Sequence, residues 1–216
     1  MTFDDLEAQA RARQLTILGG FHPLPKDAAP AGSKTLLLLG PNEPDFWPAF
    51  TMEPEWQDGS ADPMDRWSAR VIEAWAKELG AKALFPFGGA PFLPFYSWAT
   101  RTGRIHASPI QLLVHDKAGL FVSFRGALAL SRHIALPPSP SRPCDTCETQ
   151  PCLNCCPVGA IDTVSYDVPK YKTHLNDLAG AECMSRGCAA RRACPVSQRY
   201  ARLDAQSAYH MRVFKG

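Results

Sequence analysis

The eight cysteines of this 216-residue chain are confined to two short segments, and they constrain the fold more than any other feature. The first segment, Cys144 to Pro157, reads CDTCETQPCLNCCP, and the second, Cys183 to Pro195, reads CMSRGCAARRACP. Each segment ends in the dipeptide Cys-Pro. Four cysteines of the first segment follow the pattern C-x2-C-x4-C-x3-C-P: Cys144, Cys147, Cys152 and Cys156.

This pattern differs from a known cluster-binding motif by two inserted residues. Bacterial-type ferredoxins hold cubane iron–sulfur clusters with a C-x2-C-x2-C-x3-C-P run, whose fourth cysteine binds the other cluster. Zinc and metal-free thiols are the alternatives. Structural zinc sites favour two well-separated C-x2-C pairs. Here Cys144–Cys147 and Cys152–Cys155 have that form, but zinc leaves the Cys-Pro endings unexplained.

Charge and hydropathy predict a cytoplasmic protein. The net charge of +2 predicts neither a membrane nor a nucleic-acid partner. Met1 to Ala10 contains three acidic residues where a signal peptide needs a basic start and an apolar run. No segment approaches the roughly 20 apolar residues of a membrane helix. In a reducing cytosol, clustered cysteines favour metal or redox chemistry over disulfides.

Residues 1–136 alternate between helical and strand patterns, which predicts a layered mixed-sheet α/β domain. A first helix is expected from Asp4 to Leu15, followed by an apolar run that stops at Gly19-Gly20. The uninterrupted apolar run Thr35 to Leu39 predicts a buried strand of a parallel or mixed sheet. Ala83 to Phe87 predicts another strand.

The clearest helix begins with Asp62 as N-cap and Pro63 in the first turn, and it ends at Gly80. Its core face is expected to contain Trp67, Val71, Ala74, Trp75 and Leu79. Farther along, Ile110 to His115 and Leu120 to Phe124 predict a hairpin. Residues 137–143 predict a stiff proline-rich linker, and residues 144–216 a cysteine-rich module with a basic tail.

The order of these parts resembles the epoxyqueuosine reductase and reductive dehalogenase superfamily. The similarity covers roughly Phe85 to Gln198, and Cys156 to Ile161 reads CPVGAI in both. Six further residues match the family's W-A-A-R-A-G and T-L-L-I stretches: Trp98, Ala99, Arg101, Gly103, Leu112 and Leu113. The resemblance implies a corrinoid-binding domain of nitroreductase-like fold, followed by a ferredoxin-like module that passes electrons from two 4Fe–4S clusters to cobalt.

The resemblance also implies site residues. By analogy, a corrinoid site would include Gly103, His106, Ser108 and His115, with either histidine as an axial ligand, a proton donor or an ordinary packed side chain. Two features of the family differ in this chain. The family's G-W-I-G-K-H segment is replaced by IHASPI at Ile105 to Ile110. The family's catalytic aspartate would fall near Gly88 to Ala90, where this chain has no acidic residue. The helical repeats with which epoxyqueuosine reductase holds transfer RNA have no counterpart. Epoxyqueuosine reduction is therefore not predicted.

The family's crossed ligation implies two clusters. The first would take Cys144, Cys147, Cys152 and Cys194. The second would take Cys156, Cys183 and Cys188, one ligand short of a complete set because Arg191 stands where a further cysteine would be expected. Cys155 is either that fourth ligand or a buried apolar thiol, and we favour the buried thiol.

Seven basic residues and the single acid Asp204 give the tail from Cys183 to Gly216 a charge of about +6. Arg186, Arg191 and Arg192 would favour the reduced, more negative state of a nearby cluster. The tail could also steer an acidic redox partner, contact RNA phosphates or form a solvated helix face.

The sequence therefore predicts a 4Fe–4S electron-transfer protein and, if it is an enzyme, an iron–sulfur oxidoreductase acting on a cofactor or small-molecule substrate. Two alternatives stay open. One is a corrinoid-dependent or corrinoid-processing reductase that binds cobalamin, and the other is a zinc-stabilised interaction module.

Overall fold

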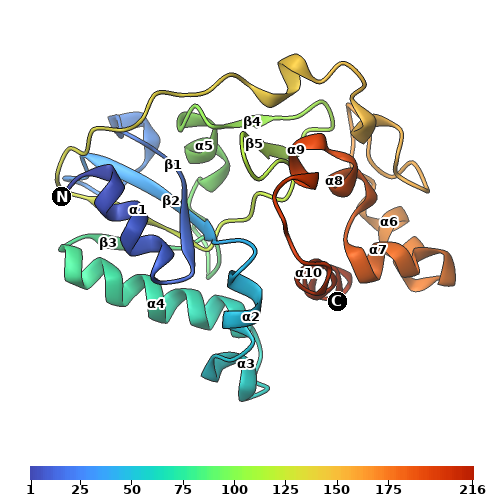
Figure 1. Ribbon diagram of the computed structural model, residues 1–216, viewed down its shortest axis with the longest axis horizontal. Coiled ribbons are helices and arrows are strands. Elements are labelled where there is room, and N and C mark those ends of the chain that lie inside the picture. The colour runs from blue at the N-terminus through green and yellow to red at the C-terminus, as the bar shows by residue number, and fades with distance from the viewer. The chain divides into compact units, whose positions relative to one another are not determined.

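An antiparallel sheet of four strands forms the centre of the first of two units in the computed structural model, which describes residues 1–216 (Figure 1). The first unit comprises Met1–Arg104 and Ser123–Pro140, and the second comprises Ile105–Val122 and Ser141–Gly216. This division places residues 105–122 with the cysteine segments, whereas the sequence grouped them with the α/β domain. No helix of the protein combines the length and apolar character needed to cross a membrane.

The strand order in the first unit is β1-β2-β6-β3. Its strands are β1 (Leu15–Phe21), β2 (Thr35–Pro41), β3 (Lys82–Leu84) and β6 (Gly126–Leu130). Its helices are α1 (Phe3–Arg11), η1 (Pro25–Asp27), α2 (Phe46–Phe50), α3 (Pro54–Gln57), α4 (Pro63–Leu79) and α5 (Phe95–Arg101), of which η1 is a 3₁₀ turn.

The strand predicted at Thr35 to Leu39 is confirmed as β2, and all of its residues are buried. The predicted parallel or mixed sheet is wrong, because β1, β6 and β3 all pair antiparallel to their neighbours. A continuous apolar run reports that both faces of a strand are covered. It does not report the direction of the neighbouring strand.

Strand β1 continues through the glycine pair at which the sequence predicted it to stop. A Cβ atom at Gly19 would lie 2.8 Å from the Cβ of Thr102, so the glycine admits the end of α5 against the strand. The first helix is correspondingly shorter than predicted: it ends at Arg11, and Leu15 begins β1.

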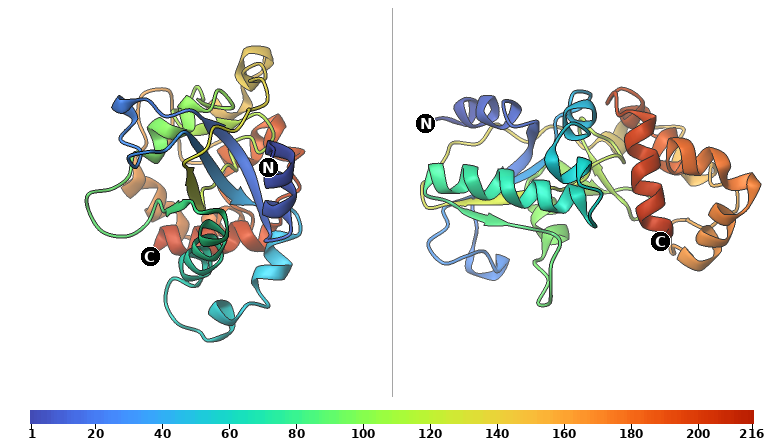
Figure 2. Two further views of the ribbon diagram at one scale, coloured as in Figure 1. Left: turned by 90° about the vertical axis from the view of Figure 1, so that its left-hand side faces the viewer. Right: turned by 90° about the horizontal axis from the view of Figure 1, so that it is seen from below.

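Helices α1 and α4 lie side by side against the sheet (Figures 1 and 2). Trp75 of α4 donates its indole N–H to Gln9 Oε1 of α1 at 2.9 Å. The left-handed Gly80 ends α4 as predicted. Asp62, however, is itself left-handed and its side chain caps no backbone N–H. The predicted core face is wrong in part, because Ala74 is exposed while Ile72 is buried.

The second unit is built from short elements around two apolar clusters. Its strands, β4 (Ile105–Ala107) and β5 (Leu113–His115), pair with each other. The predicted pairing with Leu120 to Phe124 is wrong, because those residues form no strand. The helices are η2 (Pro143–Thr146), η3 (Pro151–Leu153), α6 (Val168–Asn176), η4 (Leu178–Gly180), α7 (Ala181–Arg186), α8 (Ala189–Ala193), α9 (Pro195–Gln198) and α10 (Asp204–Lys215).

A fully buried hydroxyl ties β2 to the segment after β6. Thr35 Oγ1 donates to the carbonyl oxygen of Arg132 at 3.0 Å and accepts from the N–H of Ile134 at 2.9 Å. The threonine thus satisfies two backbone groups where no strand partner does. Removing one member of such a buried pair costs about 1–3 kcal/mol.

We expect Thr35→Val, which keeps the side-chain volume, to lower the free energy of unfolding of the first unit by about 1–3 kcal/mol. All five tryptophans belong to this unit, so tryptophan fluorescence during urea unfolding reports its stability. Thr100→Val is the control, because it removes an exposed hydroxyl and should change stability by less than about 0.5 kcal/mol. Equal stability of both variants would contradict the bridging role of Thr35.

Candidate metal centre

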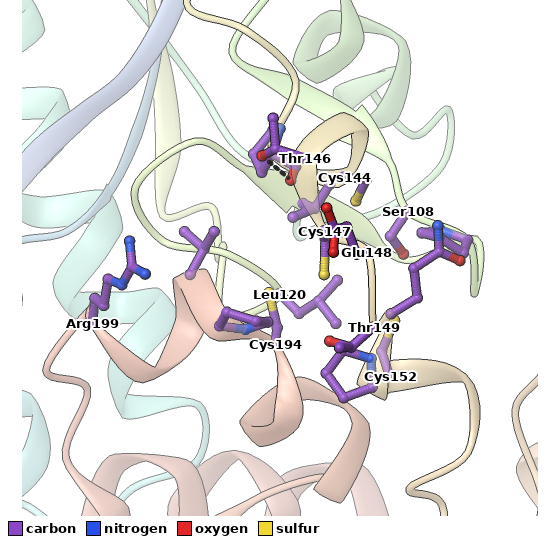
Figure 3. Close-up of a pocket in the computed structure, with 17 residues that line it drawn as sticks. Ser108, Leu120, Cys144, Thr146, Cys147, Glu148, Thr149, Cys152, Cys194 and Arg199 are labelled. Atoms are coloured by element: carbon purple, nitrogen blue, oxygen red, sulfur yellow. Dashed lines mark hydrogen bonds between the residues drawn. The ribbon is translucent and has the colours of Figure 1, made fainter.

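Four cysteines line one cavity of about 300 Å³ in the second unit (Figure 3). They are Cys144, Cys147, Cys152 and Cys194, and we call them the first thiol group. This is the set that the resemblance implied for a first cluster. Cys152 and Cys194 are buried, and Cys144 and Cys147 are half-buried. Leu120 and Val114 contribute to the apolar wall, and Arg199 and Glu148 are among the polar lining residues.

Prolines fix the local backbone that presents these thiols. Cys144 lies in η2, which begins at Pro143, and Cys152 lies in η3, which begins at Pro151. Cys194 precedes Pro195, the first residue of α9, and has extended dihedral angles (φ −62°, ψ 122°). A residue before proline is held in this extended region, and proline suits a first helical position. The Cys-Pro ending therefore sets the conformation from which the Cys194 side chain leaves the backbone.

The segment Ile105–Val122 forms one wall of the cysteine core. Ile110, Val114 and Leu120 pack in the same apolar cluster as Cys152 and Cys194. Burying each such side chain contributes roughly 1.5–3 kcal/mol.

Two polar contacts hold Leu120 in this wall. Its N–H donates to Ser197 Oγ at 2.8 Å, and its carbonyl oxygen accepts from the Arg191 guanidinium. Arg191, at the position where the resemblance implied a further cysteine, thus holds the wall of the cavity by a hydrogen bond to a backbone carbonyl.

The thiols of the first group repel one another's charged forms. Burial raises the pKa of Cys144, and the neighbouring Cys194 and Cys147 raise it further. Burial likewise raises the pKa of Cys152 to about 11, with additional contributions from Cys144 and Cys194. Without a cation, Cys144 and Cys152 are therefore protonated near neutral pH.

The other four cysteines form a second thiol group, which we define as Cys155, Cys156, Cys183 and Cys188. Cys156, Cys183 and Cys188 share an apolar cluster with Tyr171. Cys155, like Cys156 and Cys188, packs against the apolar cluster that contains Cys152 and Cys194. Burial raises the pKa of Cys155, with further contributions from Cys188 and Cys156. Its thiol also contacts the carbonyl oxygen of Cys152 at 3.7 Å. Burial and Cys188 raise the pKa of Tyr166 to about 12.

No set of three or more His, Cys, Asp or Glu side chains has the arrangement of a site for a metal ion. The thiols of the first group are instead distributed around the walls of a cavity. Figure 3 shows the labelled cysteines around this space, on ribbons from both cysteine segments.

The arginines of the tail are largely engaged within the unit. Arg186 pairs with Glu182 at 3.3 Å and with Asp204 at 3.1 Å, and Arg192 pairs with Glu182 at 3.0 Å. Arg202 donates to the carbonyl oxygen of Phe121 at 3.0 Å. Arg199 differs: it is exposed, makes no ion pair and lines the cavity.

The four residues of the predicted corrinoid site fall in different units. Gly103 belongs to the first unit and is left-handed (φ +68°), while the other three belong to the second. His115 is buried, its Nδ1 accepts from the N–H groups of Lys117 and Ala118, and its Nε2 lies 3.1 Å from Asp116. His106 lies on β4, opposite Val114. Ser108 lines the cavity of the first thiol group. The corrinoid stays a prediction.

Sequence reasoning missed the contribution of residues 105–122 to this centre. Spacing along the chain cannot show that Leu120 packs beside Cys152, because the contact depends on a docked loop. The Cys152-x2-Cys155 spacing did indicate that Cys155 lies close to Cys152, because a turn can bring residues at this spacing together. No local pattern marked Ser197 or Arg191 as partners of Leu120.

The chain has no match among protein-family models, curated proteins or solved structures.

Gly119 allows the loop to approach α9, so we expect Gly119→Ala to destabilise the cysteine core. The residue is left-handed (φ +56°), and a Cβ atom would lie 2.5 Å from Ser197 Oγ. Backbone strain and overpacking together predict a loss of about 2–4 kcal/mol in the free energy of unfolding. The readout is far-ultraviolet circular dichroism during urea unfolding.

Gly159→Ala is the matched control, because Gly159 is also left-handed (φ +57°) but has no atom within 4 Å of the added Cβ. It should lose only the strain of about 1–2 kcal/mol. Tryptophan fluorescence, which reports the first unit, should not change in either variant. Equal losses in the two variants would show that the contact between Gly119 and Ser197 does not hold the loop.

Proposed function

We propose that this protein is an iron–sulfur electron-transfer protein in which the first thiol group holds a 4Fe–4S cluster. The observation that carries this proposal is the cavity of about 300 Å³ lined by four cysteines. This space is many times the roughly 10–15 Å³ that one water molecule needs. A polyatomic cluster suits such a space better than a single zinc ion, whose four ligands must converge within about 2.3 Å.

The donor set supports the same choice. Four thiolates complete a cubane cluster, and such a cluster supplies one-electron transfer when it is bound. The chain contributes an apolar wall from Ile110, Val114 and Leu120, which excludes water from one side. Low local polarity and nearby hydrogen bonds set the reduction potential.

The second thiol group supplies donors for a second cluster, with Cys155 as the fourth. Support comes from the packing of Cys155, Cys156 and Cys188 against one apolar cluster and from the burial of Cys183. This revises the preference for Cys155 as an inert buried thiol. The first thiol group does not depend on it, because its own four cysteines are complete.

A protein of this kind needs a reduced one-electron donor and an oxidised acceptor, so one electron enters and one leaves without any bond being formed. Arg199, exposed beside the cavity and free of ion pairs, suits an acidic partner protein at this position. Charge steering of this type weakens as salt is added.

Protein purified anaerobically should be brown and contain at least about four iron and four sulfide per chain, or about eight of each if both thiol groups bind clusters. Cys194→Ala should lose about four of each, because it removes one ligand of the first thiol group. The brown absorption of the unmodified protein should bleach on reduction.

Cys155→Ala is the control, because Cys155 does not line the cavity and the first four irons should stay. Stoichiometric zinc without iron in the unmodified protein would overturn the proposal in favour of an interaction module. Full iron retention by Cys194→Ala would show that the first thiol group does not hold the cluster.

A further inference from the structure

Ser108 is a buried hydroxyl without a partner. Only 4% of its surface is exposed, and its Oγ makes no hydrogen bond within the protein. Leaving a buried hydroxyl unpaired costs about 1–3 kcal/mol. Ser197, the buried serine on α9, by contrast accepts the N–H of Leu120. Ser108 therefore lacks a compensation that a comparable side chain of the same unit has.

The backbone around Ser108 is fully engaged in the turn between β4 and β5. Its N–H donates to the carbonyl oxygen of Leu112 at 2.9 Å, and its own carbonyl oxygen accepts from Gln111 at 2.9 Å. Gln111 completes the turn in a left-handed conformation (φ +62°). The turn fixes the main chain of Ser108, and no local backbone group forms a hydrogen bond with its hydroxyl.

The hydroxyl is at the right place to act on whatever occupies the cavity. Ser108 lines the same space as the four cysteines of the first thiol group. Figure 3 shows it at the edge of this space. The unpaired hydroxyl of Ser108 and the four cysteine sulfur atoms thus line the same cavity.

We propose that the Ser108 hydroxyl donates a hydrogen bond to a sulfur atom of the group held by the first thiol group, and thereby raises the reduction potential of that group. The inference rests on the proposed function. Reduction adds negative charge that is shared by the sulfur atoms, and a hydrogen-bond donor stabilises the more negative state. The resemblance predicted that Ser108 contacts a corrinoid, and the proposal instead gives it a role in setting the reduction potential of an iron–sulfur centre.

The test is a redox titration of anaerobically purified protein, following the spectroscopic signal that Cys194→Ala removes. Ser108→Ala should keep its iron and sulfide but shift the midpoint to a more negative potential. The expected effect is a three- to tenfold lower ratio of reduced to oxidised protein at fixed potential, where tenfold equals 59 mV for one electron.

Two variants separate hydrogen bonding from packing. Ser108→Thr restores the hydroxyl and should return the midpoint toward that of the unmodified protein. Thr149→Ala removes a hydroxyl from an exposed residue of the same cavity, where water can replace it, and should leave the midpoint unchanged.

Full iron content with an unchanged midpoint in Ser108→Ala would overturn this inference and leave the proposed function intact. Absence of iron from the unmodified protein would instead overturn the proposed function. If Ser108→Ala fails to fold, the unmodified protein still decides the question. Its reduced cluster should show hyperfine coupling to one exchangeable hydroxyl deuteron after transfer into heavy water, and the lack of such a deuteron would refute the hydrogen bond.

Discussion

Thiolates that share a small, partly dry space repel one another, and a cation between them removes this repulsion. Cys144 and Cys152 illustrate the effect, because burial and the neighbouring cysteines both raise their pKa values. Binding a metal cluster requires deprotonated thiols, so its free energy of binding is also a free energy of folding for the loops that carry them. If the proposed cluster is bound, this linkage would stabilise the short helices η2 and η3, which have only four and three residues.

The loop from Ile105 to Val122 gives this centre its apolar wall. It enters the second unit through the β4–β5 pair and is fixed at Leu120 by Ser197 and Arg191, from the helices on either side of Cys194. A segment far from the cysteines in sequence thereby controls the environment of their sulfur atoms. The same segment places Ser108 in the cavity, so the apolar wall and the buried hydroxyl come from one loop.

Sequence patterns predicted what depends on neighbouring residues. The apolar run of β2 and the glycine end of α4 are local features, and the structure contains both. Grouping of Cys194 with the first segment came from the family resemblance, and the cavity joins the same four cysteines. The nitroreductase-like and ferredoxin-like folds themselves stay predictions.

What the sequence could not show depends on long-range pairing. The residues of β2 do not indicate whether its neighbouring strands are parallel or antiparallel. Strand β6 is hard to predict for another reason, because it is a short run of glycine, alanine and leucine that β propensity does not favour. The wrong hairpin partner of β5 has the same origin, because apolar alternation cannot choose between two nearby segments. Side-chain contacts such as Arg191 with Leu120 arise only after the loop has docked.

X-ray absorption at the iron and zinc edges of anaerobically purified protein tests the central claim most directly, because it identifies the atoms beside the bound metal. A 4Fe–4S cluster predicts iron surrounded by sulfur, with other iron atoms as its next neighbours. Zinc bound to four sulfur atoms without a neighbouring metal would contradict the account.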